Sequence, residues 1–204
     1  MNVVTIIDYG MCNLDSVARA VEECGGRPRV TDDPRDLREA THIILPGVGA
    51  FPEAMANLRR SGFDVAIREQ VDSAEIPLLG ICLGMQLLVS KGFEGEETTG
   101  LDLIPGEVRR LQPMNGLERI PHMGWNELHL QDGCPLLEGI EPGSDFYFVH
   151  SFHVVCASAY VRAITPYAGG FISVIGHGRV FGTQFHPEKS QRLGFRVLRN
   201  FLNL

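Results

Sequence analysis

The sequence has little of what marks several large classes of protein. No cluster of Lys and Arg exceeds two or three residues, and 18 Lys and Arg against 25 Asp and Glu leave a formal net charge of −7. Nucleic-acid backbones require a basic stripe, so we expect no nucleic-acid partner. The apolar runs fall far short of the ~20 residues that span a bilayer, so we expect no membrane segment. The first residues lack the basic and apolar regions of a signal peptide, so we expect a cytoplasmic protein.

Paired cysteines and metal-ligand spacings are also scarce. The five cysteines are an odd number without a C-x-x-C pair, which fits free thiols better than disulfides or a zinc site. His150 and His153 have H-x-x-H spacing, but on one strand their side chains would face opposite sides. We therefore expect neither a metal nor a cofactor.

What is present describes one globular domain over residues 1–204. The chain is 44% apolar, and a chain of this length buries roughly 70% of the surface that its unfolded form exposes. No internal repeat, low-complexity segment or linker interrupts the sequence. A hydrophobic core alone can therefore stabilise the fold.

Strand-like and helix-like segments alternate through the first half. This alternation is typical of βαβ units on a parallel sheet, and it predicts an α/β fold. The expected strands are Val3–Ile7, Arg29–Thr31, His42–Leu45 and Pro77–Ile81, and the expected helices are a segment from the N-cap Asn13 to Gly25, about Pro52–Arg60, Phe63–Val71 and Leu83–Lys91.

The second half is mostly strand-like, and several of its strands are expected to pair antiparallel. Ser190 is the expected N-cap of a last helix that carries Leu193, Val197, Leu198 and Phe201 on one face. The expected strands are Val108–Leu111, Trp125–Leu130, Phe146–His153, Val161–Thr165, Ile172–Ile175 and Val180–Phe185.

Cys82 is the candidate nucleophile. It lies between a continuously apolar strand and a helical segment, with Gly80 and Gly84 on either side in a G-x-C-x-G pattern. Glycines relieve crowding in the strained turn that lifts a nucleophile above a sheet, and a helix N-terminus favours the thiolate. The alternative is a small buried cysteine in a glycine-rich turn. Cys12, Cys24, Cys134 and Cys156 lack this setting.

A cysteine nucleophile needs a base and a group that orients the base. His186 and Glu188 flank a proline, and residues i and i+2 of an extended chain point to the same side. Glu188 can then hold the His186 imidazole. A tetrahedral intermediate also needs two N–H donors. Leu83, directly after the nucleophile, supplies one candidate, and Val48 or Gly49 in the loop that follows a strand supplies the other.

These motifs resemble those of class I, triad-type glutamine amidotransferases. Within that superfamily the chain is similar to the glutaminase subunit of imidazole glycerol phosphate synthase. The motifs are LPGVGAF at 45–51, GICLGMQLL at 80–88, IPHMGWNE at 120–127, YFVHSF at 147–152 and GTQFHPEKS at 182–190. The resemblance implies a three-layer, flavodoxin-like fold with a mostly parallel central sheet, flanking helices and a smaller antiparallel portion.

The resemblance also implies an activity and its residues. Cys82, His186 and Glu188 would hydrolyse L-glutamine to glutamate and ammonia through a thioester. The ammonia would pass to a cyclase subunit that makes imidazole glycerol phosphate and an aminoimidazole carboxamide ribotide in histidine biosynthesis. The substrate contacts that it suggests are Gln86, Glu94, which would meet the α-amino group, and Ser151 and Phe152, near the α-carboxylate.

The chain has no phosphate-binding P-loop or dinucleotide fingerprint, so the acceptor of the ammonia must bind to a partner. Trp125, the only tryptophan, lies near Met123, and both residue types are enriched in interface cores. Trp125 alternatively belongs to the core of this chain. The family resemblance favours an interface, with Asn13 and Lys189 as neighbours.

Three other functions remain open from the sequence. The chain could be a free-standing Cys-His-Glu hydrolase, such as a peptidase or a γ-glutamyl hydrolase. It could be a non-catalytic subunit that keeps the fold for binding, although the intact triad argues against this. It could also be a paralogue that supplies ammonia for an amidino sugar of a surface polysaccharide.

Overall fold

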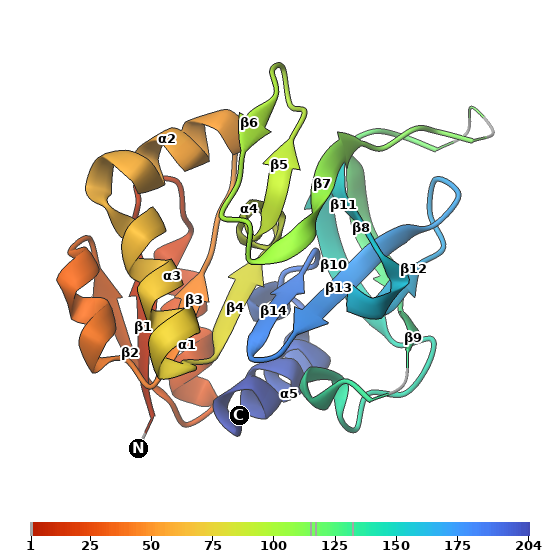
Figure 1. The fold of residues 1–204 in the computed structure, drawn as a ribbon. Helices are drawn as coiled ribbons and strands as arrows, with labels where there is room; N and C mark the ends of the chain where they lie inside the picture. Colours follow the sequence, from red (N-terminus) through yellow and green to blue (C-terminus); the bar gives the residue numbers. More distant parts are fainter. Residues whose placement is uncertain (1, 115, 117, 132) are drawn as a thin grey trace.

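The fold is organised around one large mixed sheet. A computed structural model describes residues 2–114, 116, 118–131 and 133–204. The sheet has eight strands in the order β2-β1-β3-β4-β14-β13-β12-β9 (Figure 1). The first five are parallel, and the last three are antiparallel. Their bounds are β1 Val3–Ile7, β2 Arg27–Thr31, β3 His42–Leu45, β4 Leu78–Ile81, β9 His129–Leu130, β12 Val161–Thr165, β13 Phe171–His177 and β14 Val180–Thr183.

Helices cover both faces of this sheet. In Figure 1, α2 (Phe51–Ser61) and α3 (Phe63–Ala74) lie in front of the sheet. The helices α1 (Leu14–Glu23) and α5 (Gln191–Leu202) contact each other on the other face. The parallel order 2-1-3-4 followed by β14 is that of flavodoxin-like folds. The predicted α/β class and its three layers are confirmed.

Two smaller sheets flank one end of the large one. The first has the order β11-β7-β5-β6, and the second pairs β10 with β8. Their bounds are β5 Val89–Gly92, β6 Thr98–Thr99, β7 Ile104–Arg110, β8 His122–Glu127, β10 Asp145–His150 and β11 Phe152–Cys156. The remaining regular elements are α4 (Leu83–Leu87) and four 3-10 segments, η1 Pro34–Glu39, η2 Pro135–Leu137, η3 Ser158–Tyr160 and η4 Pro187–Lys189.

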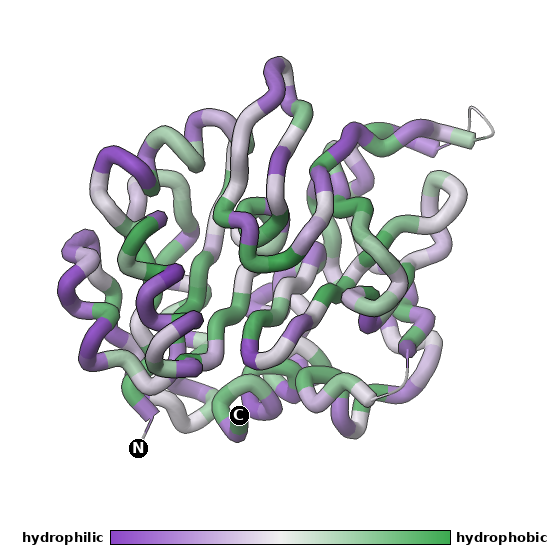
Figure 2. Tube along the Cα trace, viewed as in Figure 1, coloured by the Kyte–Doolittle hydropathy of each residue, from purple (hydrophilic) through white to green (hydrophobic). Residues whose placement is uncertain are grey.

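The core has two halves because neighbouring residues of a strand point to opposite faces. On β1, Ile6 packs in the half that contains α1 and α5, whereas Ile7 packs in the half that contains α2 and α3. Ile44 and Ile43 of β3 divide in the same way. Figure 2 shows hydrophobic residues along these central strands and hydrophilic ones on the outer turns. Strands buried on both faces read as apolar runs.

The predicted helix Leu83–Lys91 is wrong in its second half. The helix α4 ends at Leu87, and the chain continues as β5. Val89 pairs with Ile104 in the parallel ladder of β5 and β7, and Lys91 pairs with Thr99 in the ladder with β6. An apolar run is buried equally well in either conformation, so tertiary pairing decided the outcome.

The predicted strand Phe146–His153 is also wrong, because the chain breaks at Ser151. The strand β10 pairs with β8, whereas β11 pairs with β7 in another sheet. At the break, His150 Nδ1 lies 2.8 Å from the Phe152 carbonyl oxygen. The predicted strand Trp125–Leu130 is likewise divided between β8 and β9. Continuous alternation along the sequence does not reveal a change of partner strand.

Two predicted N-caps lie at the expected positions but do not cap with their side chains. Asn13 precedes α1, and its side chain makes no cap hydrogen bond within the described part of the chain. The Ser190 hydroxyl precedes α5 but donates to the His186 carbonyl oxygen at 2.7 Å and accepts from the Tyr147 N–H at 3.0 Å. Ser190 therefore braces the segment that carries His186.

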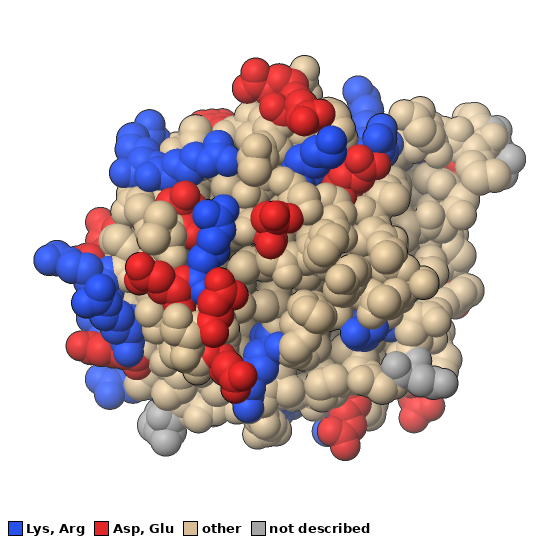
Figure 3. Space-filling view, viewed as in Figure 1, with Lys and Arg blue, Asp and Glu red and all other residues tan. Residues whose placement is uncertain are grey.

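On the face shown in Figure 3, basic and acidic side chains are interspersed over the helices, whereas the surface over β12 and β13 carries fewer charges. Among the described residues, no helix combines the length and the apolar character needed to cross a membrane.

Candidate active site

Cys82 occupies a strained turn between β4 and α4. Its backbone has φ 54° and ψ −108°, a conformation that L-residues adopt only when the surrounding structure imposes it. The Cys82 N–H donates to the Thr183 carbonyl oxygen of β14 at 2.7 Å, which ties the turn to the neighbouring strand. Such strain is typical of nucleophile turns.

The two glycines of the G-x-C-x-G pattern are required by close packing. A Cβ on Gly84 would lie 1.8 Å from the Leu45 carbonyl oxygen of β3, and one on Gly80 would lie 2.6 Å from backbone atoms of Gly84. No side chain fits at either position without moving the backbone. The glycines therefore let α4 approach the sheet and place Cys82 at the carboxyl end of β4.

His186 and Glu188 form a buried pair beyond the end of β14. His186 Nδ1 lies 2.8 Å from Glu188 Oε1, and the two side chains are 3% and 2% exposed. Burial lowers the pKa of His186, but the neighbouring Cys82 and Glu188 outweigh it and raise the pKa. Nε2 of His186 has no hydrogen-bond partner among the described residues. Nδ1 is thus held by Glu188, and Nε2 is left available for proton transfer.

A cavity of about 290 Å³ opens beside this pair. It lies at the carboxyl ends of β3, β4 and β14, where α/β folds place their sites. The cavity is lined by Cys82 and His186 and by every residue predicted to form the oxyanion hole or to contact the substrate. The lining residues are Val48, Gly49, Cys82, Leu83, Gln86, Glu94, Val149, His150, Ser151, Phe152 and His186. A larger cavity of about 850 Å³ lies at the other end of β14, and its lining includes no cysteine.

Comparison with known proteins agrees with this geometry. Residues 5–204 match the family described as "Glutamine amidotransferase class-I". The chain belongs to this family. It is 48% identical over 201 residues to "Imidazole glycerol phosphate synthase subunit HisH 1" of Campylobacter jejuni strain RM1221, across 98% of this chain and 100% of that protein. It is 50% identical over 202 residues to the subunit HisH of Moorella thermoacetica, across 98% and 94% of the two chains.

The relationship extends to archaea and to solved structures. The subunit HisH of Archaeoglobus fulgidus is 42% identical over 201 residues, across 98% of both chains. A structure titled "Structure of PurLQS from Thermotoga maritima" superposes with a TM-score of 0.75 at 22% identity, across 100% of this chain and 99% of that one. The latter likeness concerns the fold. The predicted family is confirmed, and the chain is an enzyme of the glutamine amidotransferase class.

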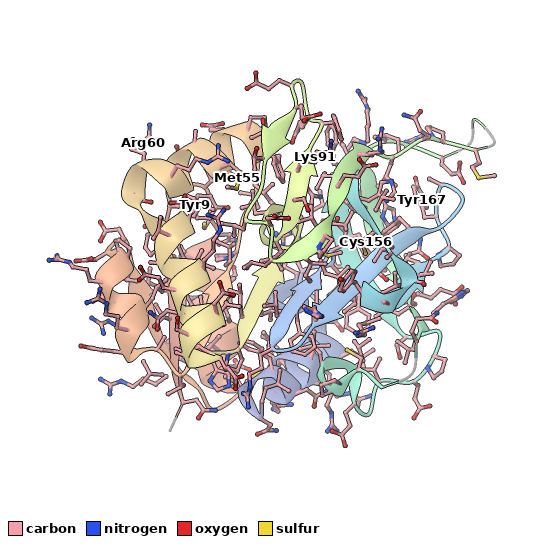
Figure 4. All side chains as sticks on the ribbon, viewed as in Figure 1. Tyr9, Met55, Arg60, Lys91, Cys156 and Tyr167 are labelled. Atoms are coloured by element: carbon pink, nitrogen blue, oxygen red, sulfur yellow. The ribbon has the colours of Figure 1, made fainter. Side chains whose placement is uncertain are left out.

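The loop after β3 carries both alternatives for the second oxyanion donor, Val48 and Gly49. The Val48 N–H donates to the Met11 carbonyl oxygen at 2.9 Å, so it is not free to bind an oxyanion in this conformation. The same loop is held by Tyr9, labelled in Figure 4, whose hydroxyl donates to the Pro46 carbonyl oxygen at 2.9 Å. Gly49 lines the cavity with φ 113°. Of the two alternatives, Gly49 is the one whose amide remains a candidate here.

Two predicted substrate residues also make structural contacts. Glu94 Oε2 accepts from the Phe51 N–H at 2.8 Å and so caps the N-terminus of α2. The Gln86 side-chain amide donates to the Phe152 carbonyl oxygen at 2.9 Å and to Gln184 Oε1 at 3.1 Å. Because both residues still line the cavity, these contacts fix their side chains beside the space for a substrate.

The residues predicted for a partner interface are all exposed. Met123 and Trp125 are 65% and 48% exposed, which excludes a core position for Trp125. Both lie on β8, and Asn13 and Lys189 are exposed at α1 and η4. Exposure leaves these residues accessible to a partner subunit.

Sequence reasoning missed Gln184. It is fully buried, and its side-chain amide donates to Cys82 Sγ at 3.7 Å. β14 ends at Thr183 and the chain bends at Gln184 and Phe185, so the alternation of an extended strand could not place Gln184 beside Cys82.

Burial lowers the reactivity of the four other cysteines. Burial raises the pKa of Cys12 and of Cys156 to about 11, and it also raises the pKa of Cys24 and of Cys134. At neutral pH these thiols are protonated and poorly nucleophilic. Within the described residues, no three His, Cys, Asp or Glu side chains are grouped so that they could hold a metal ion.

Proposed function

We propose that this chain is the glutaminase subunit of an imidazole glycerol phosphate synthase, and that it hydrolyses L-glutamine to L-glutamate and ammonia. The observation that carries the proposal is the buried His186–Glu188 pair at 2.8 Å, with His186 and Cys82 lining one cavity. Relatives that are 48% and 50% identical are named as HisH subunits of imidazole glycerol phosphate synthase, which supports the assignment to this synthase. The chain acts as a single domain over residues 1–204.

The chemistry is nucleophilic catalysis by Cys82. Its thiol gives its proton to the His186 imidazole, and the sulfur attacks the side-chain carboxamide carbon of glutamine. The resulting tetrahedral oxyanion is bound by backbone N–H groups. Leu83 begins α4, so its N–H lacks a partner within the helix and supplies the first donor. Gly49, or Val48 after its bond to Met11 opens, supplies the second.

Proton transfer belongs to His186. Its imidazolium gives a proton to the departing ammonia, and the C–N bond breaks to leave a thioester on Cys82. His186 then takes a proton from water, which attacks the thioester and releases glutamate and the thiol. Glu188 keeps Nδ1 of the imidazole occupied, so that Nε2 is the atom that exchanges protons.

The substrate's ends are assigned to the cavity walls. Ser151 and Phe152 lie near the α-carboxylate. Gln86 is a further polar contact of the substrate, and Glu94 binds the α-amino group. The volume of about 290 Å³ suits one small amino acid. Glutamine is therefore a ligand of matching size and polarity.

A cyclase subunit receives the ammonia. Free ammonia is protonated in water and loses its nucleophilicity, so the two sites must be joined by a dry path. The exposed Trp125 and Met123, with Asn13 and Lys189 as neighbours, are the proposed docking residues. The cytoplasm is the proposed compartment.

The experiment is a turnover assay with defined alternatives. Glutamine is supplied with and without the cyclase, and Cys82→Ala is the matched variant. We expect ammonia release by the wild type, none by the variant, and labelling of Cys82 alone by an electrophilic glutamine analogue. Release of products from peptides without a partner would instead favour a free-standing hydrolase. Gene neighbours in a polysaccharide cluster would favour the amidino-sugar paralogue.

A further inference from the structure

The sulfur of Cys82 has two polar neighbours that the mechanism above does not use. Gln184 Nε2 lies 3.7 Å from Sγ, and the Val149 carbonyl oxygen lies 3.8 Å from it. Gln184 is fully buried directly after β14. A carbonyl oxygen can only accept, whereas the Gln184 amide nitrogen can only donate. Gln184 is therefore the side chain that can stabilise negative charge on the sulfur.

The orientation of the Gln184 amide is set by Gln86. Nε2 of Gln86 faces two acceptors, the Phe152 carbonyl oxygen at 2.9 Å and Gln184 Oε1 at 3.1 Å. These acceptors use both hydrogens of the Gln86 amide. Because Oε1 of Gln184 is occupied in this way, its Nε2 must point to the other side, where Cys82 lies.

The Phe152 carbonyl oxygen is in turn held by a second donor, His150. His150 Nδ1 lies 2.8 Å from it, and His150 Nε2 lies 3.1 Å from His122 Nδ1. Asn126 Nδ2 lies 3.4 Å from His122 Nε2. His122 and His150 are register partners across β8 and β10, so the antiparallel ladder itself places the two rings together.

The hydrogen-bond partners of His122 and His150 require one tautomer of each imidazole ring. The Phe152 oxygen can only accept, so His150 carries its hydrogen on Nδ1 and accepts at Nε2. His122 must then donate from Nδ1 and accept from Asn126 at Nε2. Burial lowers the pKa of His122 to about 4 and the pKa of His150 to about 3, which keeps both rings neutral. Donation thus runs from Asn126 through His122 and His150 to the Phe152 carbonyl oxygen, which also accepts from Gln86.

The surroundings lock both rings in place. His122 is 3% exposed and stacks on Tyr167 at 4.0 Å, and Figure 4 labels Tyr167 near the loop that joins β12 and β13. His150 is 6% exposed, and its ring centroid lies 4.7 Å from that of Phe171 in an edge-to-face arrangement. A buried polar group without a hydrogen-bond partner is costly, so these contacts favour one orientation of each ring.

We propose that Gln184 is a further catalytic residue, which donates a hydrogen bond to the Cys82 sulfur when the sulfur is negatively charged. Gln86, His150 and His122 act as positioning residues that hold the Gln184 amide in the donating orientation. The inference rests on the proposed glutaminase function for its effect on turnover. Negative sulfur occurs twice in that cycle, before attack on glutamine and when the thioester is cleaved, and a fixed donor favours both states.

The test compares Gln184→Met with wild type. Met keeps the length of the side chain but has no N–H, and Gln131→Met, at an exposed position, is the matched control. The rate of Cys82 alkylation by iodoacetamide is followed against pH, with mass spectrometry to resolve Cys82 from the other four cysteines. We expect the midpoint of the Gln184→Met profile to move up by about one pH unit, with kcat lowered about 10- to 100-fold and KM within about twofold.

An unchanged alkylation profile in a folded Gln184→Met variant would overturn the role of Gln184. If that variant does not fold, Gln184→Glu replaces it, because its carboxylate offers an acceptor beside the sulfur and should move the midpoint in the same direction. The alkylation readout does not depend on glutamine. A wild type that fails to hydrolyse glutamine but shows the shift therefore removes the proposed function and keeps this inference.

The positioning residues are tested separately. Asn places its Nδ2 where His150 has Nδ1, so His150→Asn should recover most of the activity and of the alkylation profile that His150→Leu loses. Nitrogen-15 NMR of the histidines in the unaltered protein should show both His122 and His150 as neutral rings protonated at Nδ1. A ring protonated at Nε2, or no difference between the two His150 variants, would overturn the positioning chain.

Discussion

The His186 imidazole and the Glu188 carboxylate meet at 2.8 Å inside a proline-containing turn, with both side chains almost wholly buried. The Ser190 hydroxyl holds the His186 carbonyl oxygen from the other side at 2.7 Å. The base is thus oriented through its side chain and through its backbone. Removing either contact should affect proton transfer before it affects substrate binding.

Replacing His186 should cost more activity than replacing Glu188. His186→Ala removes the group that moves the proton, which is worth about 10²- to 10⁴-fold in rate. Glu188→Gln keeps a hydrogen-bond acceptor for Nδ1 and should lose less. Steady-state turnover and glutamine binding by calorimetry measure the two effects. We expect both variants to bind glutamine, and wild-type turnover in Glu188→Gln would remove it from the triad.

The same pair should make stability depend on pH in the alkaline range. Burial lowers the pKa of His186, but Cys82 and Glu188 raise it to about 10, above the ordinary value of 6.5. Their stabilisation is fully present below pH 6.5 and is lost as the pH rises through about 10. The free energy of unfolding should fall across this window, and should fall less in Glu188→Gln. Urea titrations at several pH values test this, and parallel curves for the two proteins would contradict it.

The protein should be more stable with glycine than with alanine at position 82. The φ of 54° and ψ of −108° at Cys82 cost any residue with a Cβ roughly 1–3 kcal/mol, and glycine returns part of this through its larger unfolded-state entropy. We expect Cys82→Gly to exceed Cys82→Ala by about 1 kcal/mol in urea unfolding. At Cys156, in β11, the same pair of substitutions should give the reverse order. The same order at both sites would show that the turn is not strained.

Two substitutions of Glu94 should distinguish its role in helix capping from its role in substrate binding. Its carboxylate accepts from the Phe51 N–H at the start of α2, so Glu94→Ala should lower the free energy of unfolding by about 1 kcal/mol and also raise KM. Glu94→Gln keeps an acceptor for Phe51 but has no charge for the α-amino group. We expect it to raise KM about tenfold with little loss of stability. An unchanged KM would leave Glu94 with capping alone.

Trp125→Ala should weaken binding of the cyclase without unfolding the chain. Trp125 is 48% exposed, and truncation of an aromatic interface residue typically costs about 2 kcal/mol or more. Titration calorimetry and thermal melting measure the two quantities. Val65, 54% exposed on α3, is the control, and Val65→Ala should change neither. An unaltered dissociation constant for Trp125→Ala would place the interface elsewhere.

The sequence alone determined the parts of the site that depend on local geometry. A cysteine between two glycines at a strand–helix junction predicted the strained turn, and the spacing of His186 and Glu188 predicted their pairing. The two side chains meet through the 3-10 segment η4 and not through the extended chain that was expected. The alternation of apolar segments likewise determined the parallel half of the sheet. These features involve neighbours in the chain, so no distant contact was needed to predict them.

The tertiary structure decided what depends on distant partners. Leu87 and Val89 have similar burial, but the ladder with β7 turns the second into a strand residue. The Val48 amide is taken by Met11, from a loop 37 residues earlier in the chain. Gln184 and His150 acquire their roles from Gln86 and His122, which lie on other elements. Hydrogen-bond partners and strand pairing are set by packing in three dimensions. The periodicity of a sequence does not indicate which strand or side chain a residue will pair with.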